Sequence, residues 1–96
     1  MYKVRYSTKF KRDVKLAKKR GLPIKELKDV IETLAAGNSL APKYHDHNLI
    51  GNYAMFRECH IQPDWLLIYR IDNNELEVLA YRTGTHSDLF SQLLIS

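Results

Sequence analysis

Three short strand-like segments separated by tight turns restrict the possible folds of this chain most strongly. The segments cover residues 53–61, 65–71 and 76–82 and are rich in β-branched and aromatic side chains. A Pro-Asp pair at 63–64 marks the first turn, and an Asp-Asn-Asn run at 72–74 marks the second. Connections this short join strands as antiparallel neighbours. The second half of the chain is therefore predicted to form an antiparallel meander.

The first part of the chain predicts a strand followed by two helices. Residues 2–6 alternate apolar and basic side chains, which is typical of a half-buried strand. Ser7 or Thr8 then offers an N-cap for a helix that stops at Gly21, and a second amphipathic helix follows and is closed by Gly37. Two helices joined by so short a turn are expected to form an antiparallel hairpin.

The remaining segments complete one domain, residues 1–96. Residues 38–52 lack periodicity and predict a loop that carries function. Thr85 and Asp88 have the spacing of a capping box and predict a short last helix packed down by Phe90, Leu93 and Leu94. The expected fold class is α+β: an N-terminal strand and a helical hairpin packed on a twisted antiparallel sheet, with a short C-terminal helix. The opposite face of the sheet is left partly solvated or free to bind a partner.

Charge and cysteine content narrow the function classes. The 96 residues carry a net charge of +4, which favours an anionic partner such as nucleic acid, a membrane surface or an acidic protein. The single cysteine, Cys59, cannot form an intrachain disulfide. The N-terminus lacks the apolar stretch of a signal peptide, and no apolar run approaches the ~20 residues that span a bilayer. These features predict a cytosolic protein.

Side chains suited to acid–base chemistry gather in the second half of the chain. His60 and Asp64 flank one tight turn, and Arg82 ends the last predicted strand. Cleavage of an RNA phosphodiester needs a base for the 2′-hydroxyl, an acid for the leaving 5′-oxygen, and cations for the phosphate charge. Histidine suits the first two roles and arginine the third. The chain holds four histidines: His45, His47, His60 and His86.

Two other interpretations of these residues stay open at this point. The His45-x-His47 pair with His60 and Asp64 has the composition of a metal site, although no cysteine pair supports it. The basic face of the first helix is, taken alone, more simply a solvated surface.

Three spaced motifs resemble the YafQ branch of the RelE-like toxins. They are D-H-x-L-x-G from Asp46, R-x-x-H-x-x-P-D-W-x-L-I-Y from Arg57, and R-T-G-T-H-x-x-L-F from Arg82 to Phe90. The resemblance implies the toxin of a type II toxin–antitoxin system, an endoribonuclease that cuts mRNA in the ribosomal A site. It further implies an antitoxin of the DinJ or RelB kind as partner, the ribosome as the place of action, a monomeric free toxin, and no cofactor or metal.

The resemblance also assigns roles to individual residues. His47, His60, Asp64 and His86 match the catalytic residues of the family. His86 is expected to be the general acid, His47 or Asp64 the general base, and His60 a group that holds and charge-balances the phosphate.

Further residues receive expectations from the same resemblance. Arg82 matches a phosphate-facing arginine, and Phe90 matches an aromatic residue that stacks on a base of the mRNA. Trp65 is either a core residue or a substrate contact, Cys59 is expected to be a small strand residue without catalytic function, and His45 has no counterpart in the family. Residues 91–96 extend past the last motif and match no functional pattern.

If the protein acts on the ribosome, its basic first helix would face the phosphates of ribosomal RNA and could bind them. Two rival functions share the scaffold: a ParE-like toxin directed at DNA gyrase, and a non-catalytic RNA- or protein-binding module. The histidine cluster argues against both. The residues expected to contact RNA backbone are Lys9, Lys11, Arg12, Lys15, Lys18 and Lys19.

Overall fold

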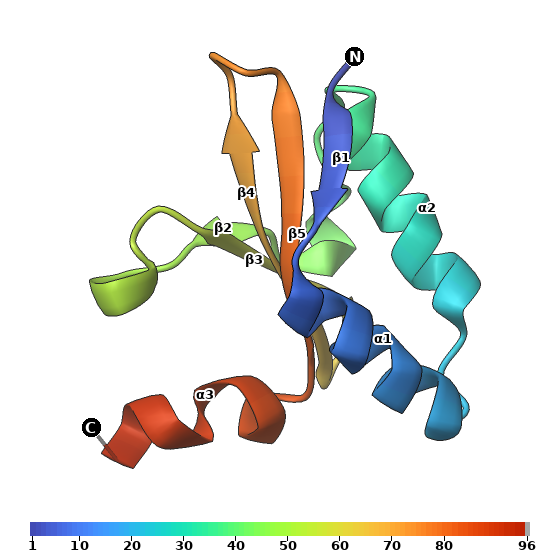
Figure 1. Ribbon diagram of the computed structural model, residues 1–96, viewed down its shortest axis with the longest axis vertical. Helices are drawn as coiled ribbons and strands as arrows, with labels where there is room; N and C mark the ends of the chain where they lie inside the picture. Colours follow the sequence, from blue (N-terminus) through green and yellow to red (C-terminus); the bar gives the residue numbers. More distant parts are fainter. Residues whose placement is uncertain (96) are drawn as a thin grey trace.

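The computed structural model describes residues 1–95, and side chains as far as residue 90. The side chains of Leu93 and Leu94, expected to pack the last helix, and the end of the tail 91–96 lie outside this part. Figure 1 shows two helices together on one side and a third apart from them, which confirms the predicted α+β class. The elements are β1 (Lys3–Tyr6), α1 (Thr8–Lys19), α2 (Ile24–Ala35), the 3₁₀ turn η1 (Pro42–Tyr44), β2 (His47–Asn48), the 3₁₀ turn η2 (Gly51–Tyr53), β3 (Arg57–Gln62), β4 (Trp65–Asp72), β5 (Glu77–Gly84) and α3 (His86–Ile95).

The described strands form one five-stranded sheet in the order β1-β5-β4-β3-β2. β3, β4 and β5 pair antiparallel in succession, which confirms the predicted meander. β1 lies at the edge and pairs parallel to β5, so the sheet is antiparallel except for this pair. No hairpin joins β1 to its neighbour, because the helical hairpin and the meander lie between them in sequence. Turn chemistry therefore does not determine the direction of β1.

The segment predicted as a loop contains a strand that the sequence did not predict. β2 has two residues, His47 and Asn48, which pair with Glu58 and Arg57 of β3. Two residues are too few to show an alternating pattern. β3 begins at Arg57, later than the predicted residue 53, because Gly51 adopts a positive φ of 68° and starts η2.

The helical hairpin forms as predicted. Ser7 is the N-cap of α1, and its side chain accepts a hydrogen bond of 2.9 Å from the backbone N–H of Phe10. Gly21 follows α1 with a φ of 77°, the left-handed conformation that ends helices. α1 and α2 bury one apolar face each against the sheet: Phe10, Ala17, Leu27, Val30, Ile31 and Leu34.

The two faces of β4 belong to two separate cores. Trp65, Leu67 and Tyr69 face the helical hairpin, and Leu66 and Ile68 face the other side, where Leu89 of α3 covers them. Both faces are buried, which explains the nearly continuous apolar run of this strand.

Two residues with alternative interpretations lie inside the first core. Trp65 is 2% exposed and belongs to the core cluster, so it is a packing residue and no substrate contact. Cys59 is fully buried, and its burial raises the pKa of the thiol far above the ordinary value. A buried thiol that keeps its proton is a poor nucleophile, as the interpretation of Cys59 as a small strand residue requires.

A hydrogen-bonded cap starts α3 and thereby places His86, its first residue. The Asp88 N–H donates to the Thr85 hydroxyl, and the Thr85 N–H donates to the Asp88 carboxylate, both at 3.0 Å. This is the predicted capping box. A Cβ on Gly84 would lie 3.0 Å from the Asp88 carboxylate, so glycine is needed for this close approach.

None of the described helices is long and apolar enough to cross a membrane.

An ion pair couples this cap to the helical hairpin and makes stability depend on acid. The hydrogen bond from Arg20 at 2.6 Å lowers the pKa of Asp88 from 3.8 to about 2. Because the folded state has the lower pKa, this stabilisation is complete above about pH 4 and is lost as the pH falls toward 2. We expect the Arg20→Gln variant to unfold at a lower urea concentration than the wild type at pH 6. Urea unfolding of both proteins from pH 6 to 2.5 should show the difference shrinking with acid; a constant difference would contradict this account.

Candidate active site

The predicted catalytic residues come from four different elements that meet at one end of the sheet. His47 lies on β2, His60 on β3, Asp64 in the turn between β3 and β4, and His86 at the start of α3. The ring centroid of His60 lies 6.3 Å from that of His47 and 5.5 Å from that of His86. The structure thus brings all four residues of the predicted set together. The meander places the ends of β3, β4 and β5 side by side, and the pairing of β2 with β3 adds His47.

His86 is held by Asp64 through two contacts. One carboxylate oxygen of Asp64 accepts the backbone N–H of His86 at 3.0 Å and lies 2.7 Å from Nδ1 of the His86 ring. These two hydrogen bonds lower the pKa of Asp64, the backbone contact being the larger cause. A carboxylate at Nδ1 keeps a proton on that nitrogen. Nε2 is then the nitrogen that can exchange a proton with a substrate.

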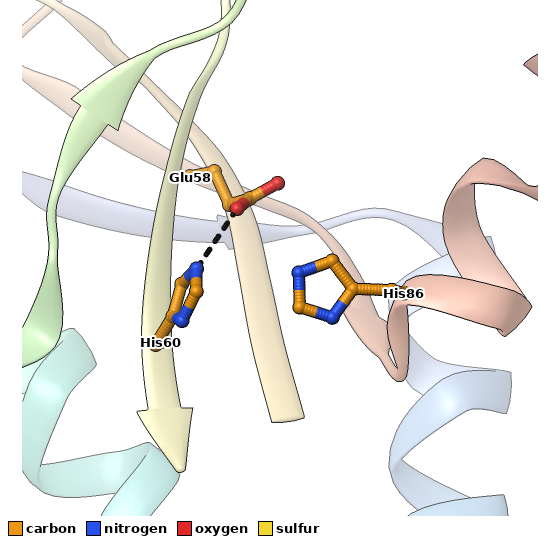
Figure 2. A group of neighbouring side chains, drawn as sticks. All are labelled: Glu58, His60 and His86. Atoms are coloured by element: carbon orange, nitrogen blue, oxygen red, sulfur yellow. Dashed lines mark hydrogen bonds and ion pairs between the residues drawn. The ribbon is translucent and has the colours of Figure 1, made fainter. Parts of the chain in front are cut away.

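Glu58 is a member of the site that the sequence analysis missed. It is 5% exposed, and its Oε1 lies 3.2 Å from Nε2 of His60 and 3.6 Å from Nε2 of His47. Figure 2 shows the Glu58 carboxylate and the rings of His60 and His86 converging on one space. A signal was present in the sequence, since Glu58 stands two residues before His60 and therefore on the same face of the strand.

The backbone of His45 orients the ring of His47. Nδ1 of His47 lies 2.6 Å from the carbonyl oxygen of His45, so Nδ1 carries a proton and donates it. In the uncharged ring Nε2 then has a free lone pair. His45 reaches this position with a φ of 50°, a left-handed conformation that is uncommon for residues other than glycine.

A second group of contacts fixes the loop that carries His47. The Asp46 carboxylate accepts hydrogen bonds from Arg57 at 3.2 and 3.3 Å and from the hydroxyl of buried Tyr69 at 2.5 Å. Arg57 also donates to the side chain of Asn48. The Asp-His pair of the first motif therefore combines an anchoring residue, Asp46, with a site residue, His47.

Arg82, the predicted phosphate contact, is bound to another residue. Its guanidinium donates to both carboxylate oxygens of Asp13 at 2.7 and 3.0 Å, and the backbone N–H of Thr83 donates to the same carboxylate. This partly buried pair fastens α1 to β5. The hydrogen bond to Asp13 raises the pKa of Arg82. A contact with phosphate stays a prediction for this residue.

We expect the Asp13→Asn and Arg82→Ala variants each to lower the unfolding free energy by about 1.5–3 kcal/mol, since each breaks charge-assisted hydrogen bonds. Denaturant unfolding measures this loss, and wild-type stability in either variant would contradict the structural role. Cleavage assays on the two folded variants test the phosphate contact separately. A larger loss of cleavage in Arg82→Ala than in Asp13→Asn is what that contact predicts.

The structure also shows where the other residues predicted to bind RNA lie. Phe90 is half-buried and packs edge to face on Tyr53, with ring centroids 6.2 Å apart, so it belongs to an aromatic group beside α3. Its stacking on a base stays a prediction. The six basic residues expected to contact RNA are all exposed along α1.

The fold and the site define a small α+β domain with an open acid–base centre. Residues 2–91 match the family described as the bacterial toxin of type II toxin–antitoxin systems, YafQ. The mRNA interferase toxin YafQ of Escherichia coli K12 is 40% identical over 89 residues, covering 91% of this chain and 94% of that protein.

Two solved structures extend the comparison. A metal-bound toxin from Helicobacter pylori is 44% identical with a TM-score of 0.88, over 94% of this chain and all of that chain. YafQ in the E. coli DinJ–YafQ complex is 36% identical with a TM-score of 0.86, over 94% of this chain and 99% of that one. The chain belongs to the YafQ family of type II toxin–antitoxin toxins.

Proposed function

We propose that this chain is an endoribonuclease toxin that cleaves mRNA in the ribosomal A site and thereby stops translation. The observation that carries this proposal is the placement of two histidines with different hydrogen-bond partners, both next to His60. His86 is paired with a carboxylate at Nδ1, and His47 is paired with a carbonyl at Nδ1. Acid–base cleavage of RNA needs one protonated and one unprotonated group on opposite sides of the phosphate.

His86 supplies the proton for the leaving group. Asp64 stabilises its imidazolium form, and Nε2 donates a proton to the 5′-oxygen as the P–O5′ bond breaks. Asp64 is occupied with two hydrogen bonds to His86. Of the two candidates for the general base, Asp64 and His47, this geometry favours His47.

His47 takes the proton of the 2′-hydroxyl. Its Nε2 has the free lone pair, and the imidazolium that forms is stabilised by Glu58 at 3.6 Å and by the carbonyl of His45. The 2′-oxygen then attacks phosphorus, so the products are a 2′,3′-cyclic phosphate and a 5′-hydroxyl end. His60, between the two, donates to Glu58 and is placed to contact the phosphate.

The partners proposed for this chain are inferred from its family and its relatives. The E. coli toxin of the DinJ–YafQ complex binds the antitoxin DinJ. We propose an antitoxin of the DinJ or RelB kind for this chain, and the cytoplasm, where ribosomes translate, as its place of action. A ParE-like attack on gyrase would not use the histidine pair, and neither would a purely structural binding module.

The basic face of α1 is proposed to hold ribosomal RNA, because exposed lysines give affinity for phosphate that falls with salt. We expect Lys11→Glu/Lys15→Glu to weaken ribosome binding at least roughly tenfold in cosedimentation and to flatten its salt dependence. Lys25→Glu/Lys28→Glu on α2 is the matched control. Equal losses in both proteins would mean that net charge alone explains the weaker binding. Unchanged binding would show that α1 does not have this role.

Metal-dependent hydrolysis is the alternative that one observation supports. Glu58, His60 and His86 each offer a ligand atom, and these atoms lie within 4.8 Å of one another. Imidazole and carboxylate suit zinc or copper. A metal there would occupy a ring nitrogen of His86, the proposed general acid. The acid–base proposal therefore expects cleavage to persist in chelator and to fall with added Zn²⁺, and the alternative expects the reverse.

Controlled expression in bacteria tests the proposal as a whole. The wild type should arrest growth and create new mRNA 5′ ends in frame within translated messages, and co-expression of the cognate antitoxin should prevent both. Growth arrest without new 5′ ends would point to a gyrase-type target. Absence of arrest with folded, abundant protein would favour a non-catalytic binding module.

A further inference from the structure

A groove of about 850 Å³ leads away from the histidine cluster toward the first half of α2. Its near end is formed by His45, His47 and His60, and its far end by Glu26 and Asp29 of α2. A volume of this size is within the range of pockets that hold small organic ligands, and exceeds the space that a catalytic proton transfer requires. The catalytic proposal accounts for the near end alone.

The middle of the groove presents an aromatic surface. Tyr44 of η1 lines it, half-buried, and its body packs against the core under α2. The ammonium of Lys43 lies 5.1 Å from the centre of the Tyr44 ring. A fixed aromatic ring beside a phosphate-cleaving centre is a surface on which a nucleobase can stack.

The far end of the groove is acidic, although the chain as a whole is basic. Glu26 accepts a hydrogen bond of 3.0 Å from Gln62, which holds it at the rim, and the exposed Asp29 stands one helical turn further along α2. Two carboxylates repel the phosphates of an RNA strand. They accept hydrogen bonds from the exocyclic amino groups of adenine, cytosine and guanine, which uracil lacks.

We propose that this groove selects the base of one nucleotide next to the scissile phosphate and prefers a base with an amino group over uracil. The phosphate stays at the histidines because the acidic end repels it. The base extends along Tyr44, with its amino group directed at Glu26 and Asp29. This inference rests on the proposed ribonuclease function, for which it names the specificity determinant.

The test uses programmed ribosomes carrying mRNAs that differ at a single A-site nucleotide. At one of the three positions, wild-type protein should cut uracil-containing mRNA at least roughly tenfold more slowly than its amino-bearing counterparts. Glu26→Gln/Asp29→Asn should reduce that ratio below about threefold, mainly by raising the rate with uracil, because amide N–H groups can donate to the uracil carbonyls. Glu32→Gln, a matched change on α2 that lies outside this groove, should keep the wild-type ratio.

The outcomes separate this inference from the proposed function. Wild-type cleavage at equal rates with all four bases at every position overturns the groove assignment, and so does a wild-type ratio in the Glu26/Asp29 variant. Absence of any cleavage by the wild type overturns the ribonuclease proposal together with the inference. Both substituted carboxylates are exposed, so thermal melting of the variants should match the wild type.

Discussion

Replacing His86 with alanine is expected to lower the single-turnover rate of mRNA cleavage by about 10²–10⁴-fold, the usual contribution of a general acid. The alanine removes the Nε2 proton donor. It leaves the α3 cap intact, since Thr85 and Asp88 form that cap without the His86 side chain. Ribosome binding, measured by cosedimentation, should therefore change by less than about twofold. A loss of binding equal to the loss of cleavage would show that His86 is a contact and no acid.

Replacing Asp64 with asparagine is expected to have a smaller effect on the same catalytic step. The amide retains a hydrogen bond to the backbone of His86 but loses the charge that stabilises the imidazolium. We expect cleavage to fall less than in His86→Ala and the alkaline limb of the pH–rate profile, where the acid loses its proton, to move to lower pH. An unchanged profile would contradict the pairing of Asp64 with a proton-donating His86. For the wild type, an acid and a base acting together predict a bell-shaped profile.

Replacing Glu58 with glutamine is expected to have the second-largest effect. The carboxylate contacts both His47 and His60, and it stabilises the imidazolium that forms on His47 when the 2′-hydroxyl loses its proton. Without the charge, cleavage should fall by about tenfold to a hundredfold. The unfolding free energy should change by less than about 1 kcal/mol, because the amide is isosteric and a buried carboxylate has its own desolvation cost.

The matched control is Glu75→Gln, a carboxylate-to-amide change in the turn between β4 and β5, which should alter neither quantity. A strong loss of stability in Glu58→Gln would make Glu58 a structural residue, and wild-type cleavage would remove it from the site.

Local patterns in the sequence predicted most of the fold. The meander follows from two tight turns, and the start of α3 follows from the spacing of Thr85 and Asp88. The parallel pairing of β1 and the two-residue strand β2 depend on contacts between distant segments, and no local pattern records them. Sequence patterns are informative where a periodic segment or a turn is itself the structural unit.

The sequence likewise predicted only part of the candidate site. Residues that could be named by type and motif, such as His60 and His86, do meet in space. Glu58 was missed because an acidic residue in a strand ordinarily faces water, whereas this one is buried and lies beside His47 and His60. Arg82 was expected at the phosphate, yet its partner Asp13 lies 69 residues away in sequence. Such pairings and the groove beside α2 arise only from the tertiary arrangement.

Cleavage of an A-site codon with a single 2′-deoxy substitution tests the central claim most directly. The substitution removes the hydroxyl on the 5′ side of the scissile phosphate and leaves the codon and the ribosome unchanged. Wild-type protein is expected to cut the all-ribose message to a 2′,3′-cyclic phosphate and a 5′-hydroxyl end, and to leave the substituted message uncut. Equal cleavage of both messages would contradict attack by the 2′-oxygen, and with it the assignment of His47 and His86 as base and acid.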